Sequence, residues 1–70
     1  MKKISVMIPC YNEEENVEPI SKAIIDVFKT QLSNYDYEIL FIDNDSQDKT
    51  REILRRMCEE DKHIKAIFNA

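Results

Sequence analysis

The chain has 70 residues, 43% of them apolar and 34% charged, and its formal net charge is -4. This length suits one small domain, because a chain this short hides only about 60% of its unfolded surface when it folds. Its lysines and arginines are scattered through an acidic chain, which argues against nucleic-acid binding. No apolar run approaches the roughly 20 residues that cross a bilayer, so we expect no membrane span. Cys10 and Cys58 occur without a secretory segment, which favours reduced thiols and a cytoplasmic protein.

The first part of the chain predicts a strand followed by a helix. Residues 3–9, with the sequence KISVMIP, are typical of a buried strand that ends at Pro9. Apolar residues then recur every three or four positions, which predicts a helix that runs to about Gln31. Asn16 suits its N-cap, and Pro19 would lie in the first turn, where proline is tolerated. The predicted buried face of this helix consists of Val17, Ile20, Ile24, Val27 and Phe28.

The second part of the chain repeats this alternation. YEILFID at residues 37–43 predicts a second buried strand, and HIKAIF at residues 63–68 predicts a third. Between them we expect a helix with Asp48 as its N-cap. The apolar stripe of this helix is predicted to consist of Thr50, Ile53, Leu54, Met57 and Cys58.

The order strand, helix, strand, helix, strand predicts an α/β fold with a parallel sheet and right-handed crossovers. This arrangement is one half of a doubly wound, Rossmann-like domain. Three parallel strands leave the edges of the sheet open. We therefore expect residues 1–70 to form a single incomplete domain, the front portion of a longer protein.

Three segments follow the strands at one end of the predicted sheet: PCYNE at residues 9–13, DNDSQD at residues 43–48 and NA at residues 69–70, and polar and acidic residues gather there. Open α/β sheets bind their ligands at this carboxyl end of the strands. The chain has no glycine, although dinucleotide fingerprints and P-loops need glycines where the backbone approaches phosphates. A NAD enzyme and a P-loop NTPase are thereby excluded. Tyrosine, carboxylate and amide side chains suit the nucleoside end of a ligand instead.

Two motifs in the chain carry a resemblance to a known family. ISVMIPCYNEEENV at residues 4–17, followed by YEILFIDNDSQDKT at residues 37–50, resembles the start of the family 2 inverting glycosyltransferases. IKAIFNA at residues 64–70 is similar to the third strand of the subgroup that transfers sugars to polyprenyl phosphates. The resemblance covers the whole chain, and it implies the nucleotide-binding half of a Rossmann-like GT-A fold.

The resemblance also implies a site for the nucleoside of a nucleotide-sugar donor, a UDP- or GDP-sugar. The residues implied for this site are Pro9, Tyr11, Glu13, Ile42, Asp43 and Asn44. The complete enzyme would transfer a hexose, with a polyprenyl phosphate as acceptor, at the cytoplasmic face of a membrane. A divalent metal, Mg²⁺ or Mn²⁺, would act on the donor diphosphate there. The resemblance places the metal ligands and the catalytic base outside this chain, which would contribute binding and no chemistry.

Two positions depart from the Asp-Asp-Gly that is common in the family. Asn44 stands at the second acidic position, where an amide donates as well as accepts hydrogen bonds, so the base preference is left open. Asp45 stands at the glycine position, which often needs a permissive backbone. Aspartate tolerates left-handed backbone geometry less well than glycine but better than most residues.

Other interpretations of these residues remain open at this stage. Pro9 also suits the end of a strand, Tyr11 suits a half-buried aromatic, and the run of glutamates suits a helix N-terminus. The alternative function is a non-enzymatic α/β binding module or a receiver-like signalling domain. Receivers carry paired acids after the first strand and a phosphoacceptor aspartate after the third. This chain has Cys10 and Tyr11 at the first place and Asn69 at the second.

Overall fold

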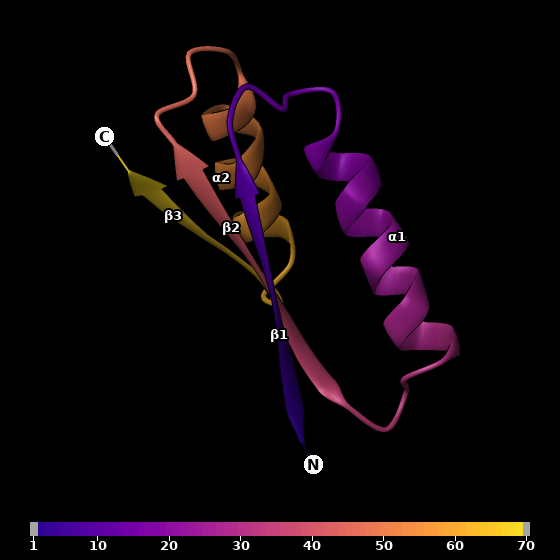
Figure 1. The fold of residues 1–70 in the computed structure, drawn as a ribbon. Helices are drawn as coiled ribbons and strands as arrows, with labels where there is room; N and C mark the ends of the chain where they lie inside the picture. The colour runs from indigo at the N-terminus through magenta and orange to yellow at the C-terminus, as the bar shows by residue number, and fades with distance from the viewer. Residues whose placement is uncertain (1, 70) are drawn as a thin grey trace.

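The computed structural model describes residues 2–69, which form three strands and two helices in the predicted order (Figure 1). The elements are β1 (Lys3–Cys10), α1 (Val17–Thr30), β2 (Asp36–Asn44), α2 (Thr50–Glu60) and β3 (Ile64–Asn69). The strands are parallel and lie in the order β1-β2-β3. The prediction of a β-α-β-α-β parallel sheet, one half of a Rossmann-like domain, is therefore confirmed.

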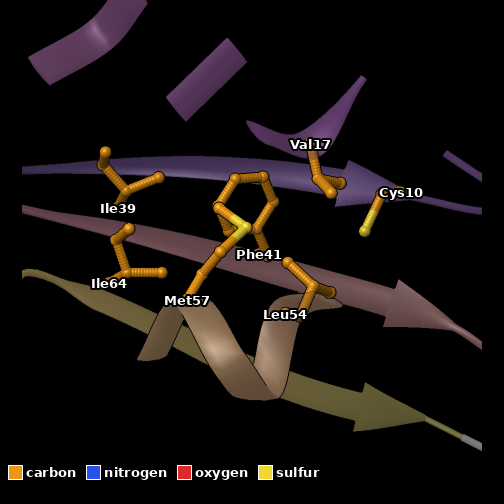
Figure 2. Packing of buried hydrophobic residues seen from close by; sticks show 7 residues of the cluster. All are labelled: Cys10, Val17, Ile39, Phe41, Leu54, Met57 and Ile64. Carbon is orange, nitrogen blue, oxygen red and sulfur yellow. The ribbon is translucent and has the colours of Figure 1, made fainter. Parts of the chain in front are cut away.

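Both helices cover one face of the sheet, and the hydrophobic core lies between them and the strands (Figure 2). Ile39 and Phe41 of β2 and Leu54 of α2 are fully buried at its centre. Successive residues in a strand point to opposite faces, so this spacing places Leu40 and Ile42 on the other face. The buried core as a whole consists of Cys10, Val17, Ile39, Phe41, Leu54, Met57 and Ile64.

The other face of the sheet has no helix over it in residues 2–69 (Figure 1). Met7 of β1 and Ile67 of β3 point to this face and are 62% and 47% exposed. Leu40 and Ile42 of the central strand are half-buried between them. We call this surface the open face, and it ends at the carboxyl edge of the sheet.

The buried face of α1 differs from the prediction. Val17 and Phe28 are buried as predicted, but Ile20 and Val27 are 38% and 41% exposed. Ser21, which the prediction omitted, is buried instead. At 3.6 residues per turn, Ser21 and Phe28 lie about 40° and 20° to one side of Val17. Ile20 and Val27 lie about 60° and 80° to its other side, beyond the stripe that faces the sheet.

The start of α2 also differs slightly from the prediction. The helix begins at Thr50 with Lys49 at the N-cap position, one residue later than expected. The carboxylate of Asp48 nevertheless accepts a hydrogen bond from the main-chain N–H of Thr50 at 2.9 Å, so it still caps the first turn. The predicted stripe of α2 is confirmed, with Thr50, Leu54 and Met57 buried and Ile53 and Cys58 partly buried.

Candidate functional site

The carboxyl ends of the three strands meet at one edge of the sheet, shown at the top of Figure 1. In register, Cys10 pairs with Asp43, and Asn44 pairs with Asn69. Residues 11–16 leave β1 at this edge and lead to α1, and residues 45–49 leave β2 and lead to α2. We call these segments the first loop and the second loop. They bring the side chains that the sequence singled out to the same edge.

The open face carries an apolar row next to this edge. Pro9 pairs with Ile42, and Ile42 pairs with Ile67, so the row crosses all three strands. Residues two apart in a strand share a face, which places Asn44 and Asn69 beside the row and closer to the edge. The amide Nδ2 of Asn69 donates to Oδ1 of Asn44 at 3.3 Å. This part of the open face is thus an apolar floor bordered by a pair of amides.

Tyr11 is the first residue of the first loop, and its side chain remains 55% exposed. An aromatic ring in such a position is free to stack on a planar ligand. Glu13 is half-buried, and its Oε2 accepts a hydrogen bond from Asn16 Nδ2 at 2.8 Å. Asn16 occupies the N-cap position of α1, as predicted, but its side chain makes no capping hydrogen bond.

The second loop holds the first loop through Asn12 and Ser46. The main-chain N–H of Asn12 donates to Ser46 Oγ at 2.9 Å. In return, the main-chain N–H of Gln47 donates to Asn12 Oδ1 at 2.7 Å. Buried or part-buried amides need such partners, because an unpaired one costs about 1–3 kcal/mol. The two loops therefore form one hydrogen-bonded unit.

The start of α2 supplies two further links to the first loop. The hydroxyl of Thr50, which is fully buried, accepts a hydrogen bond from the N–H of Glu13 at 2.9 Å. Asp48 Oδ2 accepts from the N–H of Glu14 at 3.3 Å. These contacts explain the Ser-x-Asp-x-Thr part of the second motif physically, since all three residues bind main-chain atoms of the chain itself.

Each loop contains one residue with left-handed backbone geometry. Asn12 has φ 49° and Asp45 has φ 57°. Asparagine and aspartate are the residues that most readily adopt this geometry after glycine. Asp45 stands where the family pattern commonly has a glycine. Its φ of 57° shows that the backbone there has the left-handed conformation for which glycine is usually required.

Asp43 is the most buried of the predicted site residues, with no exposed surface. It ends β2 on the helix-covered face, in the same alternation as Ile39 and Phe41. Its carboxylate accepts hydrogen bonds from the main-chain N–H of Ser46 at 3.1 Å and from the Ser46 hydroxyl. Arg51 Nε lies 3.0 Å from Asp43 Oδ2 in an ion pair without hydrogen-bond geometry. Asp43 therefore fixes the second loop and α2 from beneath the site.

Cys10 lies beside this buried carboxylate, with its Sγ 4.0 Å from Asp43 Oδ1. Burial raises the pKa of the Cys10 thiol to about 11, and the negative charges of Asp43, Glu13 and Asp48 add to the effect. Cys58 is a free thiol as well. A thiol with such a pKa stays protonated near neutral pH, so Cys10 is suited to packing and not to nucleophilic chemistry.

The structure brings Pro9, Ile42 and Asn44 together at the open side of the carboxyl edge, and the exposed Tyr11 follows β1 at the same edge. Sequence reasoning placed Asn12, Ser46 and Asn69 at this edge but missed their role in holding the arrangement, and it missed the same role for Thr50 and Arg51. The polar Ser-x-Asp-x-Thr spacing after the second strand was a usable signal for Ser46 and Thr50, because serine and threonine hydroxyls commonly bind nearby main-chain groups.

The acidic side chains that residues 2–69 place at this edge do not form a metal centre. Among residues 2–69, no group of three or more His, Cys, Asp or Glu side chains is arranged to hold an ion. Asp43 is engaged by Ser46 and Arg51, and Asp48 is engaged by Thr50. The residues described here therefore supply no ligand set for a divalent metal.

A hollow of about 140 Å³ lies between the two helices, away from this edge. Glu18, Ser21 and Met57 contribute to its lining, and none of its lining residues belongs to the predicted site. The site at the carboxyl edge is by contrast an exposed surface formed by the sheet and the first loop.

Comparison with known proteins identifies the family. The profile of Glycosyl transferase family 2 matches residues 5–70. The chain is 41% identical over 69 residues to the undecaprenyl-phosphate 4-deoxy-4-formamido-L-arabinose transferase of Photorhabdus laumondii, covering 97% of this chain and 21% of that protein. It is 44% identical over 50 residues to the dolichol-phosphate mannosyltransferase of Pyrococcus furiosus, covering 71% of this chain and 13% of that protein.

The chain spans about a fifth or less of the length of these curated relatives. The match nevertheless includes both loops, the apolar strands and the start of α2, which are the parts from which the carboxyl edge is built. The chain belongs to glycosyl transferase family 2.

Proposed function

We propose that residues 1–70 are the nucleotide-binding front portion of a larger glycosyltransferase domain. In this proposal the complete enzyme transfers a hexose from a UDP- or GDP-sugar to a polyprenyl phosphate. Two relatives named above act, by their names, on undecaprenyl phosphate and dolichol phosphate, which supports this acceptor class. Neither helix of residues 2–69 is long and apolar enough to cross a membrane. A position at the cytoplasmic face of a membrane is part of the proposal, because polyprenyl carriers are membrane lipids.

One observation carries the proposal: the exposed Tyr11 follows β1 at the same edge of the sheet as an apolar floor that ends in hydrogen-bonding amides. A nucleoside needs a planar apolar contact for its base and polar partners for its base edge and ribose. Pro9 and Ile42 would supply part of the apolar contact, and Asn44 would supply a polar one. Glu13 and Asp43 complete the proposed site, Asp43 by fixing the second loop from below.

The chemistry proposed for the complete enzyme is displacement at the anomeric carbon. An oxygen of the acceptor phosphate forms the new bond to that carbon while the bond to the donor diphosphate breaks, with inversion. A divalent metal, Mg²⁺ or Mn²⁺, would supply Lewis-acid chemistry at the leaving diphosphate in the complete enzyme. We propose that its ligands lie outside residues 2–69, and that this chain binds and orients the nucleoside.

The experiment that tests this proposal is calorimetric titration of the natural-length protein with UDP and GDP. Base stacking on an aromatic side chain is worth about 1–3 kcal/mol, so Tyr11→Ala should weaken nucleotide binding roughly 5- to 150-fold. Tyr35→Ala is the matched control, because Tyr35 is also an exposed tyrosine, 38% accessible, but precedes β2 at the opposite end of the sheet. Unchanged affinity in Tyr11→Ala, or an equal loss in both variants, would contradict the proposed site.

The receiver-like alternative lacks support. The segment after β1 offers Cys10 and Tyr11 instead of paired acids, and β3 ends in Asn69 instead of a phosphoacceptor aspartate. The family match points away from it as well.

A further inference from the structure

The two amides that border the apolar floor hold each other in a defined orientation. Asn44 ends β2 and Asn69 ends β3, and the two residues pair in register. Asn69 Nδ2 donates to Asn44 Oδ1 at 3.3 Å. The oxygen end of the Asn44 amide is therefore turned toward a neighbour within the sheet.

Asn69 is itself held from below by Arg51 of α2. Arg51 Nη2 donates to the main-chain oxygen of Asn69 at 3.1 Å. The same guanidinium forms the ion pair with the fully buried Asp43 and lies 5.1 Å above the centre of the Phe68 ring. Asn69 is thus tied to the buried part of the fold through its main chain, while its side chain reaches Asn44.

An amide offers an acceptor at one end and a two-proton donor at the other. Because the bond to Asn69 turns Oδ1 of Asn44 toward β3, its Nδ2 group is the end turned away from β3 and available to a ligand. Among residues 2–69, no protein group accepts a hydrogen bond from Asn44 Nδ2, and the residue is exposed. An aspartate in the same place would present acceptors only, which is the opposite polarity.

We propose that Asn69 is a positioning residue that makes Asn44 a hydrogen-bond donor toward the nucleoside. The donor then selects a base with a carbonyl oxygen, as in uracil or guanine, over a base with an amino group in its place, as in cytosine or adenine. A carbonyl oxygen of the base accepts a hydrogen bond from the amide N–H of Asn44. An amino group of the base is itself a donor, so it and the amide N–H would face each other without a hydrogen bond. This inference rests on the proposed nucleoside site and extends it by naming Asn44, oriented by Asn69, as the residue that discriminates between bases.

The test compares nucleotides that differ only in the base, with the natural-length protein. Affinities for UDP and CDP, and for GDP and ADP, are measured by calorimetry, and the pair that binds more tightly is used. The wild type should bind the nucleotide with the carbonyl base about tenfold more tightly than its partner with the amino base. This ratio corresponds to one hydrogen bond between the base and Asn44 in the first case and two unpaired donors in the second.

Asn69→Asp is the decisive variant. A carboxylate at position 69 only accepts, so the amide of Asn44 should turn its Nδ2 toward it and present Oδ1 to the ligand. Arg51 beside residue 69 supplies a counter-charge for the new carboxylate. The preference for the carbonyl base should fall at least about tenfold, to parity or reversal. Asn69→Ala removes the partner without imposing a polarity, so it should bring the preference close to parity.

Asn34→Asp is the matched control, since Asn34 is an exposed asparagine in the turn before β2 and far from the carboxyl edge. It introduces the same charge and should leave the base preference unchanged. Thermal melts show whether each variant is folded. Asn44→Asp provides a second route to an acceptor at the same place, and it should lose the carbonyl preference as Asn69→Asp does.

The outcomes separate this inference from the function on which it rests. If the wild type binds UDP or GDP but Asn69→Asp leaves the base preference unchanged, the positioning role is overturned and the nucleoside site stands. A wild-type preference for CDP over UDP, or for ADP over GDP, overturns it as well. Failure of the wild type to bind any of the four nucleotides overturns both proposals.

Discussion

The buried pair of Asp43 and Arg51 provides the sharpest test of how the second loop is held. Asp43 is fully buried, whereas the side chain of Arg51 is 28% exposed. Removing one partner of a buried ion pair costs about 3–5 kcal/mol, and the exposure of Arg51 reduces this through solvent screening. We therefore expect Asp43→Asn, which keeps the shape of the side chain, to lower the free energy of unfolding by about 2–3 kcal/mol.

The assay is urea unfolding in a double-mutant cycle with Arg51→Met, which removes the charge and keeps an apolar stem beside Phe68. Once one partner is absent, removal of the other should cost less, so the coupling energy should be at least about 1 kcal/mol. Glu18 and Arg56 form the control pair, with side chains 41% and 50% exposed, and their coupling should be about 0–1 kcal/mol. Strict additivity for Asp43→Asn and Arg51→Met would refute the reasoning.

Three further predictions concern other parts of the fold. Thr50→Val keeps the shape of a buried side chain but leaves a first-loop amide unpaired, so it should cost about 1–3 kcal/mol in urea unfolding, whereas Thr30→Val at an exposed site should be near neutral. Cys10, with its pKa raised to about 11, should resist alkylation at neutral pH until urea unfolds the protein, and rapid labelling of the native state would contradict its burial. Burial acts to raise the pKa of Asp61, but hydrogen bonds from His63 outweigh it and lower that pKa below 3.8. Asp61 should therefore stabilise the fold above pH 3.8 and lose this contribution as the pH falls further, and melts of Asp61→Asn should lack that part of the decline.

The strands and α2 could be predicted from the sequence because their apolar residues follow one period without interruption. The predicted face of α1 was wrong at Ile20 and Val27, since apolar residues there outnumber the positions that the sheet covers. Hydropathy alone does not reveal which edge of a broad apolar face meets the sheet, whereas the buried Ser21 marks that edge in the structure.

The carboxyl edge could be predicted from topology, because parallel strands bring their loops to one side of a sheet. The burial of Asp43 could also have been predicted from the sequence, since Asp43 follows Ile39 and Phe41 at a period of two. The hydrogen bonds between the two loops could not be predicted, because Asn12 and Ser46 are 34 residues apart in the sequence and no local pattern specifies that they pair. The orientation of the amide of Asn44 likewise depends on β3 and on its register.

The central claim is that the carboxyl edge binds the nucleoside of a nucleotide sugar, and a crystal structure of the natural-length protein with UDP or GDP tests it most directly. The base should stack against the ring of Tyr11, next to Pro9 and Ile42, with its edge within hydrogen-bond distance of Asn44 Nδ2. A nucleotide bound elsewhere, for example in the hollow between α1 and α2, would contradict the account.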